Sequence, residues 1–221
     1  MAARSRIARD PVHHPHFARW YARLAPLADE RLGLARYRAE LVAGLSGRVI
    51  EIGAGSGLNF RHFPGTVSEV VAIEPERHLR MRAADEALRA EVPVDVAPGV
   101  AEALPVKSEA FDGAVACLVL CSVRDQRRAL AELFRVLRPG GQLRLLEHCR
   151  AEGRGLVAVQ WMADHTAWPL LAGGCHTGRD TLAAVRAAGF EIVEQRPLRI
   201  PPGRFPVPSA PHVLATARRP A

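Results

Sequence analysis

A strand-like run, RVIEI, leads at residue 53 directly into the glycine-rich segment GAGSGLN. Gly53, Gly55 and Gly57 have the spacing G-x-G-x-G, and glycines in such a turn let a ligand approach the backbone closely. A dinucleotide fingerprint needs G-x-G-x-x-G, but Leu58 stands at the third glycine position. The segment therefore predicts a ligand site where a strand meets a turn, but not one built for a dinucleotide.

The segments after this loop alternate between strand-like and helix-like patterns. Strands are expected at residues 48–52, 68–74, 92–96, 111–120 and 142–147, with Pro75 opening a helix that runs to about Ala90. A second helix is expected where apolar side chains recur at helical spacing from Leu130 to Leu137, and it should end at the turn RPGG, residues 138–141. This alternation predicts an α/β fold, with a parallel sheet covered by helices on both faces.

The two ends of the chain depart from this pattern. Residues 17–45 and 153–172 are each expected to be helical, and a short helix should run from 181 to 188, between Asp180 as N-cap and Gly189 as stop. The segments FEIVEQ and HVLATA should pair antiparallel, joined by the proline-rich loop 197–211. We predict one domain over residues 1–221: an N-terminal helical cap or lid (1–45), a cofactor-binding core (48–150), a substrate lid helix (151–180) and a closing helix and strands (181–221).

Composition and charge narrow the possible partners. No apolar run reaches the roughly 18–20 residues that span a bilayer, and the four cysteines lack C-x-x-C spacing, so reduced thiols in a cytoplasmic protein are expected. The net charge of +7 comes from arginines scattered along the chain, which argues against a nucleic-acid partner. No metal-ligand spacing stands out, and His13, His14 and His16 are interpreted as a flexible tail.

Two acids strengthen the glycine signal. Glu51 lies inside the strand two residues before Gly53, and Glu74 ends the next strand, 17 residues after Gly57. An acid at the end of the second strand can accept hydrogen bonds from both ribose hydroxyls of a nucleoside. Both acids should lie at the carboxyl edge of the sheet, where open α/β sheets bind their ligands.

Five segments, VIEIGAGSGLN, AIEPE, AEALP, FDGAVACLVL and RVLRPGG, together resemble the class I S-adenosylmethionine-dependent methyltransferases. The resemblance implies a Rossmann-like, seven-stranded, mostly parallel sheet with the last strand antiparallel, and S-adenosylmethionine as cofactor. It also implies a cofactor-binding set: Glu51, Gly53, Gly55, Gly57, Asn59, Glu74, Pro75, Glu76, Ala101, Glu102, Cys117 and Leu118. In that set Glu74 holds the ribose, Pro75 and Glu76 lie on one side of the adenine with Ala101 and Glu102 on the other, and Cys117 and Leu118 flank the methionine moiety. Many relatives have Asp where this chain has Val100, so one hydrogen bond to the adenine is expected to come from elsewhere.

The second half of the chain is similar to a narrower group. LVLCSVRDQRRALAELFRVLRPGG, LLEH and DHTAWPLLAGGCHTGRDT resemble the thiol S-methyltransferases, which implies methyl transfer to the sulfur of a small molecule. Three alternatives stay open: C-, N- or O-methylation of a quinone, amine lipid or phenol; a non-catalytic cofactor-binding protein; and an RNA methyltransferase. The apolar segment CLVLCSV after the fourth strand speaks against the last, since it offers nothing to hold a flipped base.

Transfer to a thiol needs a group that accepts the thiol proton, because the thiolate is the nucleophile. His148, at the end of the fifth strand, is the first candidate for this catalytic role, followed by His165 and His176, with Asp164 to orient one of them. The wall of an apolar acceptor pocket is expected from Trp161, Met162, Trp168 and Cys121. Ordinary core packing is the competing interpretation of these four residues.

Overall fold

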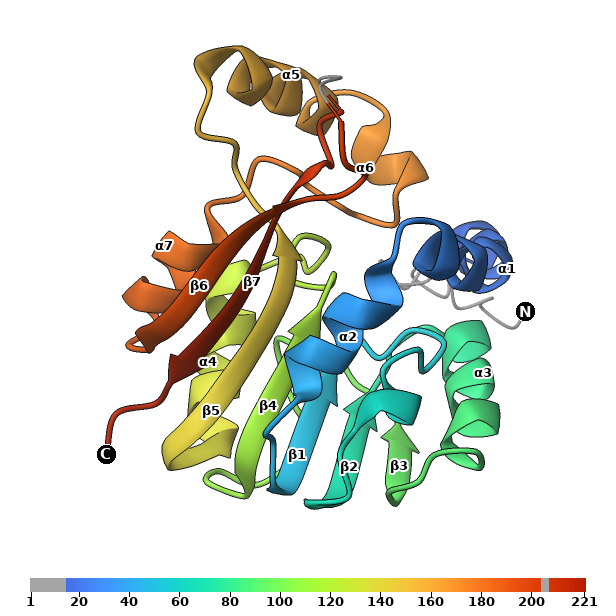
Figure 1. Ribbon diagram of the computed structural model, residues 1–221, viewed down its shortest axis with the longest axis vertical. Helices are drawn as coiled ribbons and strands as arrows, with labels where there is room; N and C mark the ends of the chain where they lie inside the picture. Colours follow the sequence, from blue (N-terminus) through green and yellow to red (C-terminus); the bar gives the residue numbers. More distant parts are fainter. Residues whose placement is uncertain (1–14, 204–206) are drawn as a thin grey trace, which may run out of the picture.

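The computed structural model describes residues 15–203 and 207–221, and the histidines at 13 and 14 lie outside these ranges. Its centre is one seven-stranded sheet in the order β3-β2-β1-β4-β5-β7-β6 (Figure 1). The strands are β1 Gly47–Ile52, β2 Val67–Ile73, β3 Val94–Ala97, β4 Phe111–Cys117, β5 Leu137–His148, β6 Glu191–Arg199 and β7 Pro211–Arg218. Only β7 runs against its neighbours, β5 and β6, so the predicted fold class is confirmed.

Helices cover both faces of this sheet, because successive side chains of a buried parallel strand point to opposite faces. The described elements are α1 Pro15–Arg31, α2 Leu34–Val42, the 3₁₀ turn η1 Phe60–His62, α3 Arg77–Ala87, α4 Gln126–Val136, α5 Arg154–Asp164, α6 Trp168–Leu171 and α7 Thr181–Ala187. In β1, Ile50 and Ile52 pack into the core below α4 and α7, whereas Val49 packs into the core below α2 and α3. In Figure 1, α5 and α6 lie beyond the end of the sheet at which β5 finishes.

Several boundaries differ from the expected ones, each for a local reason. The helix expected over 17–45 is broken between α1 and α2, where Gly33 takes a left-handed conformation (φ 66°). The helix expected over 153–172 is likewise broken into α5 and α6 by residues 165–167. Pro75 precedes α3 instead of opening it, because Glu76 is the N-cap and its carboxylate accepts from the Leu79 N–H.

The region around the fifth strand also departs from the prediction. The helix expected from Leu130 ends at Val136, just before RPGG as predicted, but RPGG itself belongs to β5, which begins at Leu137. The pairing of β4 with β5 shifts register between Phe111 and Gly113. The fourth strand stops at Cys117 and not at residue 120, because Leu118 has a left-handed backbone (φ 55°) that turns the chain out of the sheet. Within the described ranges, no helix is both long and apolar enough to cross a bilayer.

Candidate functional site at the carboxyl edge of the sheet

The glycine loop after β1 requires glycine at all three positions. Gly53, Gly55 and Gly57 have φ values of 61°, 58° and 82°, a region that side chains rarely tolerate. A β-carbon at Gly53 would lie 2.2 Å from a methyl group of Val119, and one at Gly57 would lie 2.8 Å from the ring of Phe60. The loop therefore presents bare backbone at the carboxyl edge, as its sequence predicts.

Glu74 ties this loop to the end of β2. One carboxylate oxygen accepts from the Gly55 N–H at 2.8 Å and the other accepts from the Glu76 N–H at 2.8 Å. The side chain is almost fully buried, and burial raises the pKa of its carboxyl to about 7. Glu74 thus holds the glycine loop beside β2, and its remaining lone pairs are available to hydroxyl donors.

A buried polar chain runs from the glycine loop to the N-terminal helices. Glu51 Oε1 accepts from Asn59 Nδ2 at 2.7 Å, and Asn59 Oδ1 accepts from Arg38 Nη1 at 2.9 Å. Arg38 Nε in turn pairs with Asp29 Oδ1 at 2.6 Å, and all four residues are at most 5% exposed. The second oxygen of Glu51 has no hydrogen-bond partner among the described residues, and burial raises the pKa of this carboxyl to about 7.

Sequence reasoning missed Arg38 and Asp29. The signal was present, because Arg38 falls on the same helical stripe as Leu34, Leu41 and Leu45, where an arginine is out of place. Arg38 Nη1 also contacts Cys117 Sγ at 3.2 Å, at the end of β4. Burial raises the pKa of this thiol to about 11, so Cys117 is a neutral group at ordinary pH.

The helix α1 lies across the edge of the sheet. The Tyr21 ring is 3.6 Å from the position of a β-carbon on Gly55, and Tyr21 stacks on Phe17 with ring centroids 5.5 Å apart. Phe17 in turn fills the space beside Gly173, where a β-carbon would meet its ring at 2.4 Å. Two aromatic rings of α1 thus connect the glycine loop with the segment that follows α6.

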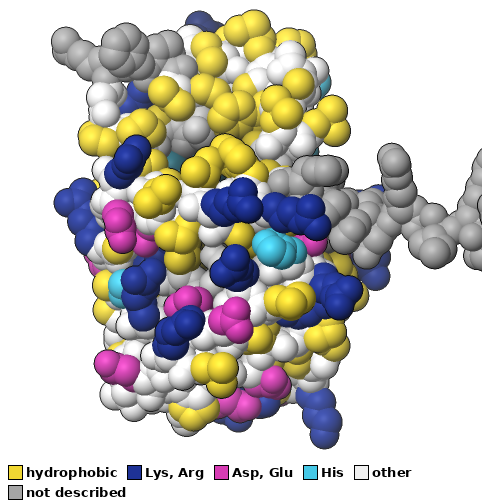
Figure 2. All heavy atoms as spheres, turned by 90° about the vertical axis from the view of Figure 1, so that its right-hand side faces the viewer, with side chains coloured by type: hydrophobic (Ala, Val, Ile, Leu, Met, Phe, Trp, Pro, Cys, Tyr) yellow, Lys and Arg dark blue, Asp and Glu magenta, His cyan; other side chains and the backbone are white. Residues whose placement is uncertain are grey.

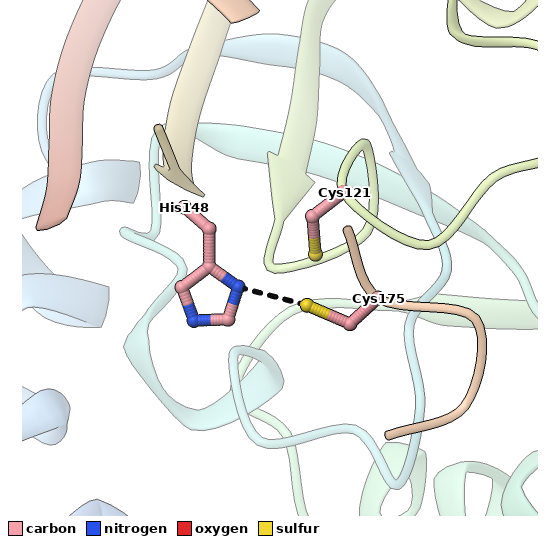
Figure 3. Close-up of side chains that lie close together, drawn as sticks. All are labelled: Cys121, His148 and Cys175. Atoms are coloured by element: carbon pink, nitrogen blue, oxygen red, sulfur yellow. Dashed lines mark hydrogen bonds between the residues drawn. The ribbon is translucent and has the colours of Figure 1, made fainter. Parts of the chain in front are cut away.

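Three potential ligand groups meet where β4, β5 and the segment after α6 converge (Figure 3). His148 Nδ1 and Cys175 Sγ are 3.2 Å apart, and Cys121 Sγ completes the group. Burial alone lowers the pKa of His148, but the hydrogen bond with Cys121 and the charges of Cys121 and Glu147 outweigh burial and leave it raised. The neighbouring His212 ring, at 4.5 Å, has its pKa lowered to about 4, chiefly by burial.

Glu147 is a second residue that sequence reasoning missed. It is 0% exposed, and its Oε1 accepts from the N–H groups of Val119 and Leu120 at 2.9 and 2.8 Å. Its Oε2 has no partner among the described residues, and burial raises the pKa of the carboxyl to about 7. Glu147 therefore fixes the turn that carries Val119 against the glycine loop and Cys121 toward His148.

The chain is similar in sequence and in fold to known proteins. The sequence pattern of a family described as a methyltransferase domain matches residues 50–145. The thiol S-methyltransferase TMT1B of Homo sapiens is 34% identical over 184 residues, covering 80% of this chain and 73% of that protein. The ubiquinone/menaquinone biosynthesis C-methyltransferase UbiE of Syntrophotalea carbinolica is 31% identical over 121 residues, covering 54% of this chain and 51% of that protein. An S-adenosylmethionine-dependent methyltransferase structure from Thermotoga maritima superimposes with a TM-score of 0.67 at 23% identity, covering 92% of this chain and 97% of that chain.

The strand order, the glycine loop and these similarities all indicate the same family. The chain belongs to the class I S-adenosylmethionine-dependent methyltransferases. It is an enzyme of a family that uses S-adenosylmethionine, as the motifs of its first half predict.

The remaining predicted cofactor residues of this methyltransferase lie along the same edge. Ala101 is buried, and Leu118 follows Cys117 in a left-handed turn. Glu102 Oε1 accepts from the N–H groups of Arg124 and Asp125, at 2.8 and 3.2 Å, so its carboxylate is bound to the start of α4.

The predicted histidines are only partly brought together. His176 donates its backbone N–H to the Cys121 carbonyl at 2.8 Å, so it adjoins the group around His148. His165 is exposed and stacks on Trp161, with ring centroids 4.4 Å apart. Asp164 is not paired with a histidine, because its carboxylate accepts from the Thr177 and Gly178 N–H groups at 2.6 and 2.9 Å.

The predicted wall of the acceptor pocket is not enclosed as expected. Trp161 is 61% exposed and Met162 is 53% exposed, whereas Trp168 is only partly exposed. Figure 2 shows apolar side chains gathered toward the top of the molecule and charged ones below. Of the four predicted wall residues, only Cys121 is buried, beside His148.

We expect Arg38→Ala to lower the free energy of unfolding by about 3–5 kcal/mol, because it leaves Asp29 buried without its cation. Urea unfolding followed by circular dichroism measures the change. Arg36→Ala, on the exposed side of the same helix, should change the stability by less than about 0.5 kcal/mol. Equal effects of the two substitutions would contradict a structural role for the buried pair.

The raised pKa of Glu147 predicts a pH dependence of stability. The folded protein holds this proton more tightly than the unfolded chain, so the contribution is full below about pH 4.5 and is lost as the pH rises through 7. Glu147→Gln keeps an acceptor but cannot ionise, and should flatten the fall in unfolding free energy between about pH 5 and about pH 8, by up to about 3 kcal/mol. The exposed Glu152→Gln should keep the wild-type slope, and a wild-type slope in Glu147→Gln would contradict the assignment.

Proposed function

We propose that this methyltransferase transfers the methyl group of S-adenosylmethionine to the sulfur of a small thiol. The observation that carries the proposal is the likeness to a thiol S-methyltransferase over 184 residues, far beyond the 96 residues of the methyltransferase domain match. The additional likeness includes residues outside the part that class I methyltransferases share. In the structure those residues include the segment that carries Cys175 to the carboxyl edge.

The residues at the glycine loop fit the cofactor. The loop offers backbone without side chains, and Glu74 offers carboxylate oxygens beside it. Oε2 of Glu51 has no hydrogen-bond partner among the described residues and can accept one from a ligand. We assign the ribose hydroxyls to Glu74, the methionine moiety to the loop, Glu51, Cys117 and Leu118, and the adenine to the region of Pro75 and Ala101. When bound, the cofactor supplies a methyl group on a sulfonium sulfur, which a thiolate attacks directly.

The protein aligns the acceptor sulfur with the methyl group and excludes water from the reacting groups. Tyr21 and Phe17 of α1 cover the glycine loop and the segment after α6, so α1 is the part of the predicted lid that reaches both. A thiol with an ordinary pKa near 8.5 is already partly ionised at neutral pH, so little help with the proton is required. His148 is the proposed proton acceptor, since it ends β5 at the carboxyl edge of the sheet.

Methylation of a quinone carbon is the second candidate. The observation in its favour is the likeness to UbiE, which covers only 54% of this chain. The free state of all four described cysteines is compatible with a reducing, cytoplasmic location, which we propose for either function.

We expect Glu74→Gln to weaken the binding of S-adenosylhomocysteine by about 1.5–3 kcal/mol, because one of the two carboxyl oxygens proposed to accept from the ribose hydroxyls is replaced by an NH₂ donor. Isothermal titration calorimetry measures this, and NAD should give no heat of binding. The control Glu69→Gln, within β2 and paired with Arg48 at 2.6 Å, should bind like the wild type. Unchanged affinity in a folded Glu74→Gln protein would remove Glu74 from the site.

The proposed acceptor is tested by turnover of labelled S-adenosylmethionine with small aliphatic and aromatic thiols, phenols, quinones and amines. We expect methylated product from thiols. Turnover of a phenol or quinone with none of any thiol would overturn the sulfur assignment and leave the family assignment intact.

His148→Ala distinguishes a proton acceptor from a structural group. If His148 accepts the thiol proton, activity should fall at about pH 7 and recover in part at about pH 9, where the acceptor is already ionised. General-base help is typically worth about 10²–10⁴-fold, and a thiol should lose less than the upper value. An equal loss at both pH values would show that His148 does not act as a base.

A further inference from the structure

Cys121, His148 and Cys175 form a group that cannot be recognised from the sequence pattern. Each of the three residues lies 27 positions after the one before it, and they come from three different segments (Figure 3). Their ligand atoms, two thiol sulfurs and one imidazole nitrogen, all lie within 4.8 Å of one another. In Figure 3 both sulfurs and Nδ1 point into the same small space.

The surrounding structure holds these three groups in place. The Glu147 carboxylate fixes the turn before Cys121, and the His176 N–H donates to the Cys121 carbonyl at 2.8 Å. Gly174 makes the approach of the third segment possible, since a β-carbon there would lie 2.9 Å from the Ser122 carbonyl oxygen. The site is therefore preorganised by main-chain contacts and does not depend on long flexible side chains.

The anchoring continues on the other side of Cys175. Arg179 Nη1 donates to the Leu120 carbonyl at 2.6 Å, and Thr181 Oγ1 donates to the His148 carbonyl at 3.3 Å. These bonds join the segment after α6 both to the turn after β4 and to the end of β5. The segment that delivers Cys175 is thus attached to both elements that deliver the other two groups.

The donor set suits a zinc ion. Two thiolates and one imidazole suit zinc, and Cys₂His is a set that catalytic zinc sites use with a fourth position left to water or substrate. Tetrahedral zinc, with bonds of about 2.3 Å to sulfur and about 2.0–2.1 Å to nitrogen, would separate sulfur and nitrogen by about 3.6 Å. The 3.2 Å between Cys175 Sγ and His148 Nδ1 needs to open by only a few tenths of an ångström.

We propose that Cys121, His148 and Cys175 bind one zinc ion. Cys121 and Cys175 are 1% and 5% exposed, so the ion would be shielded from solvent on the side of these sulfurs. Binding replaces the two thiol protons, which leave to solvent, by two zinc–sulfur bonds. A disulfide between the two cysteines would use both sulfurs but would leave the convergence of the imidazole nitrogen unexplained.

The position of the site suggests what its fourth ligand is, and this step rests on the proposed function. The turn 118–121 touches the glycine loop through Val119, against Gly53, and carries Cys121 to the zinc site. In this arrangement His148 is a ligand of the ion, which takes the place of its role as proton acceptor, and an acceptor thiol that bound the ion would lose its proton to solvent and be held as a thiolate. Its sulfur then forms the bond to the methyl carbon as the bond from that carbon to the sulfonium sulfur breaks, and the electron pair stays on the cofactor. The neutral thioether is a weaker ligand and leaves.

Direct metal binding tests the site without reference to activity. The full chain, reduced with a phosphine and treated with a chelator, is titrated with Zn²⁺ against a chromophoric chelator and, separately, with Co²⁺. We expect one ion per chain and a thiolate-to-cobalt absorption band. Cys175→Ser, Cys121→Ser and His148→Ala should each weaken zinc binding by about 100-fold or more, beyond the roughly 10–100-fold typical of changes around a metal's ligands.

Controls separate this site from others on the chain. Cys149→Ser removes the neighbouring, partly buried thiol and should bind metal like the wild type. The double variant Cys121→Ser/Cys175→Ser should lose the thiolate band while still binding S-adenosylhomocysteine, which shows that it is folded. Metal binding that persists unchanged in this double variant would place the ion elsewhere, for instance on the N-terminal histidines, and would overturn the proposal. So would an absence of zinc binding, or a Cys121–Cys175 disulfide that takes up no metal after reduction.

The role of the fourth position has its own test. Adding thiophenol to the cobalt-loaded protein should intensify the thiolate-to-cobalt band, because a third sulfur joins the ion. A cobalt spectrum that does not respond to thiophenol would overturn the acceptor-binding role and leave the metal site standing. Turnover of thiols by a protein that binds no metal would overturn the zinc site and leave the proposed function standing.

Discussion

A buried guanidinium connects three parts of this molecule at the carboxyl edge of the sheet. Arg38 pairs with Asp29 of α1, donates to Asn59 beside the glycine loop and contacts Cys117 at the end of β4. A charge that is 5% exposed is tolerated only if it is neutralised and hydrogen-bonded, so these contacts are required together. The result is that the N-terminal helices, the glycine loop and the fourth strand hold one relative arrangement.

The second arrangement on which the edge depends is the turn between Cys117 and Cys121. Its left-handed residue, Leu118, ends β4, and Glu147 from the neighbouring strand accepts two of its N–H groups. On one side the turn fills the space that a side chain at Gly53 would need, and on the other it presents Cys121 to His148. The cofactor loop and the proposed acceptor site are therefore separated by a single, fixed turn of backbone.

Much of this architecture was predictable because its signals are local. The glycine spacing, the acid at Glu74 and the alternation of strands and helices each lie within one short segment, and the structure agrees with them. Breaks inside helices were missed, since the left-handed Gly33 sits in an otherwise helical pattern. The group around His148 was missed for a different reason: its members are 27 residues apart, and only the packing of three segments brings them together.

Specificity for the acceptor should reside in the segment after β5, which extends beyond the methyltransferase domain match. Gln160 of α5 is fully buried and bonds to the backbone at Ala151, Cys149 and Thr177, so this helix is anchored although Trp161 and Met162 face outward. These bonds of Gln160 fix the course of the chain from α5 to Cys175, and α5 itself leaves the carboxyl edge of the sheet open. In the proposed function, the shared core would keep its cofactor residues while the anchored segment would decide which chemical group faces the transferable methyl.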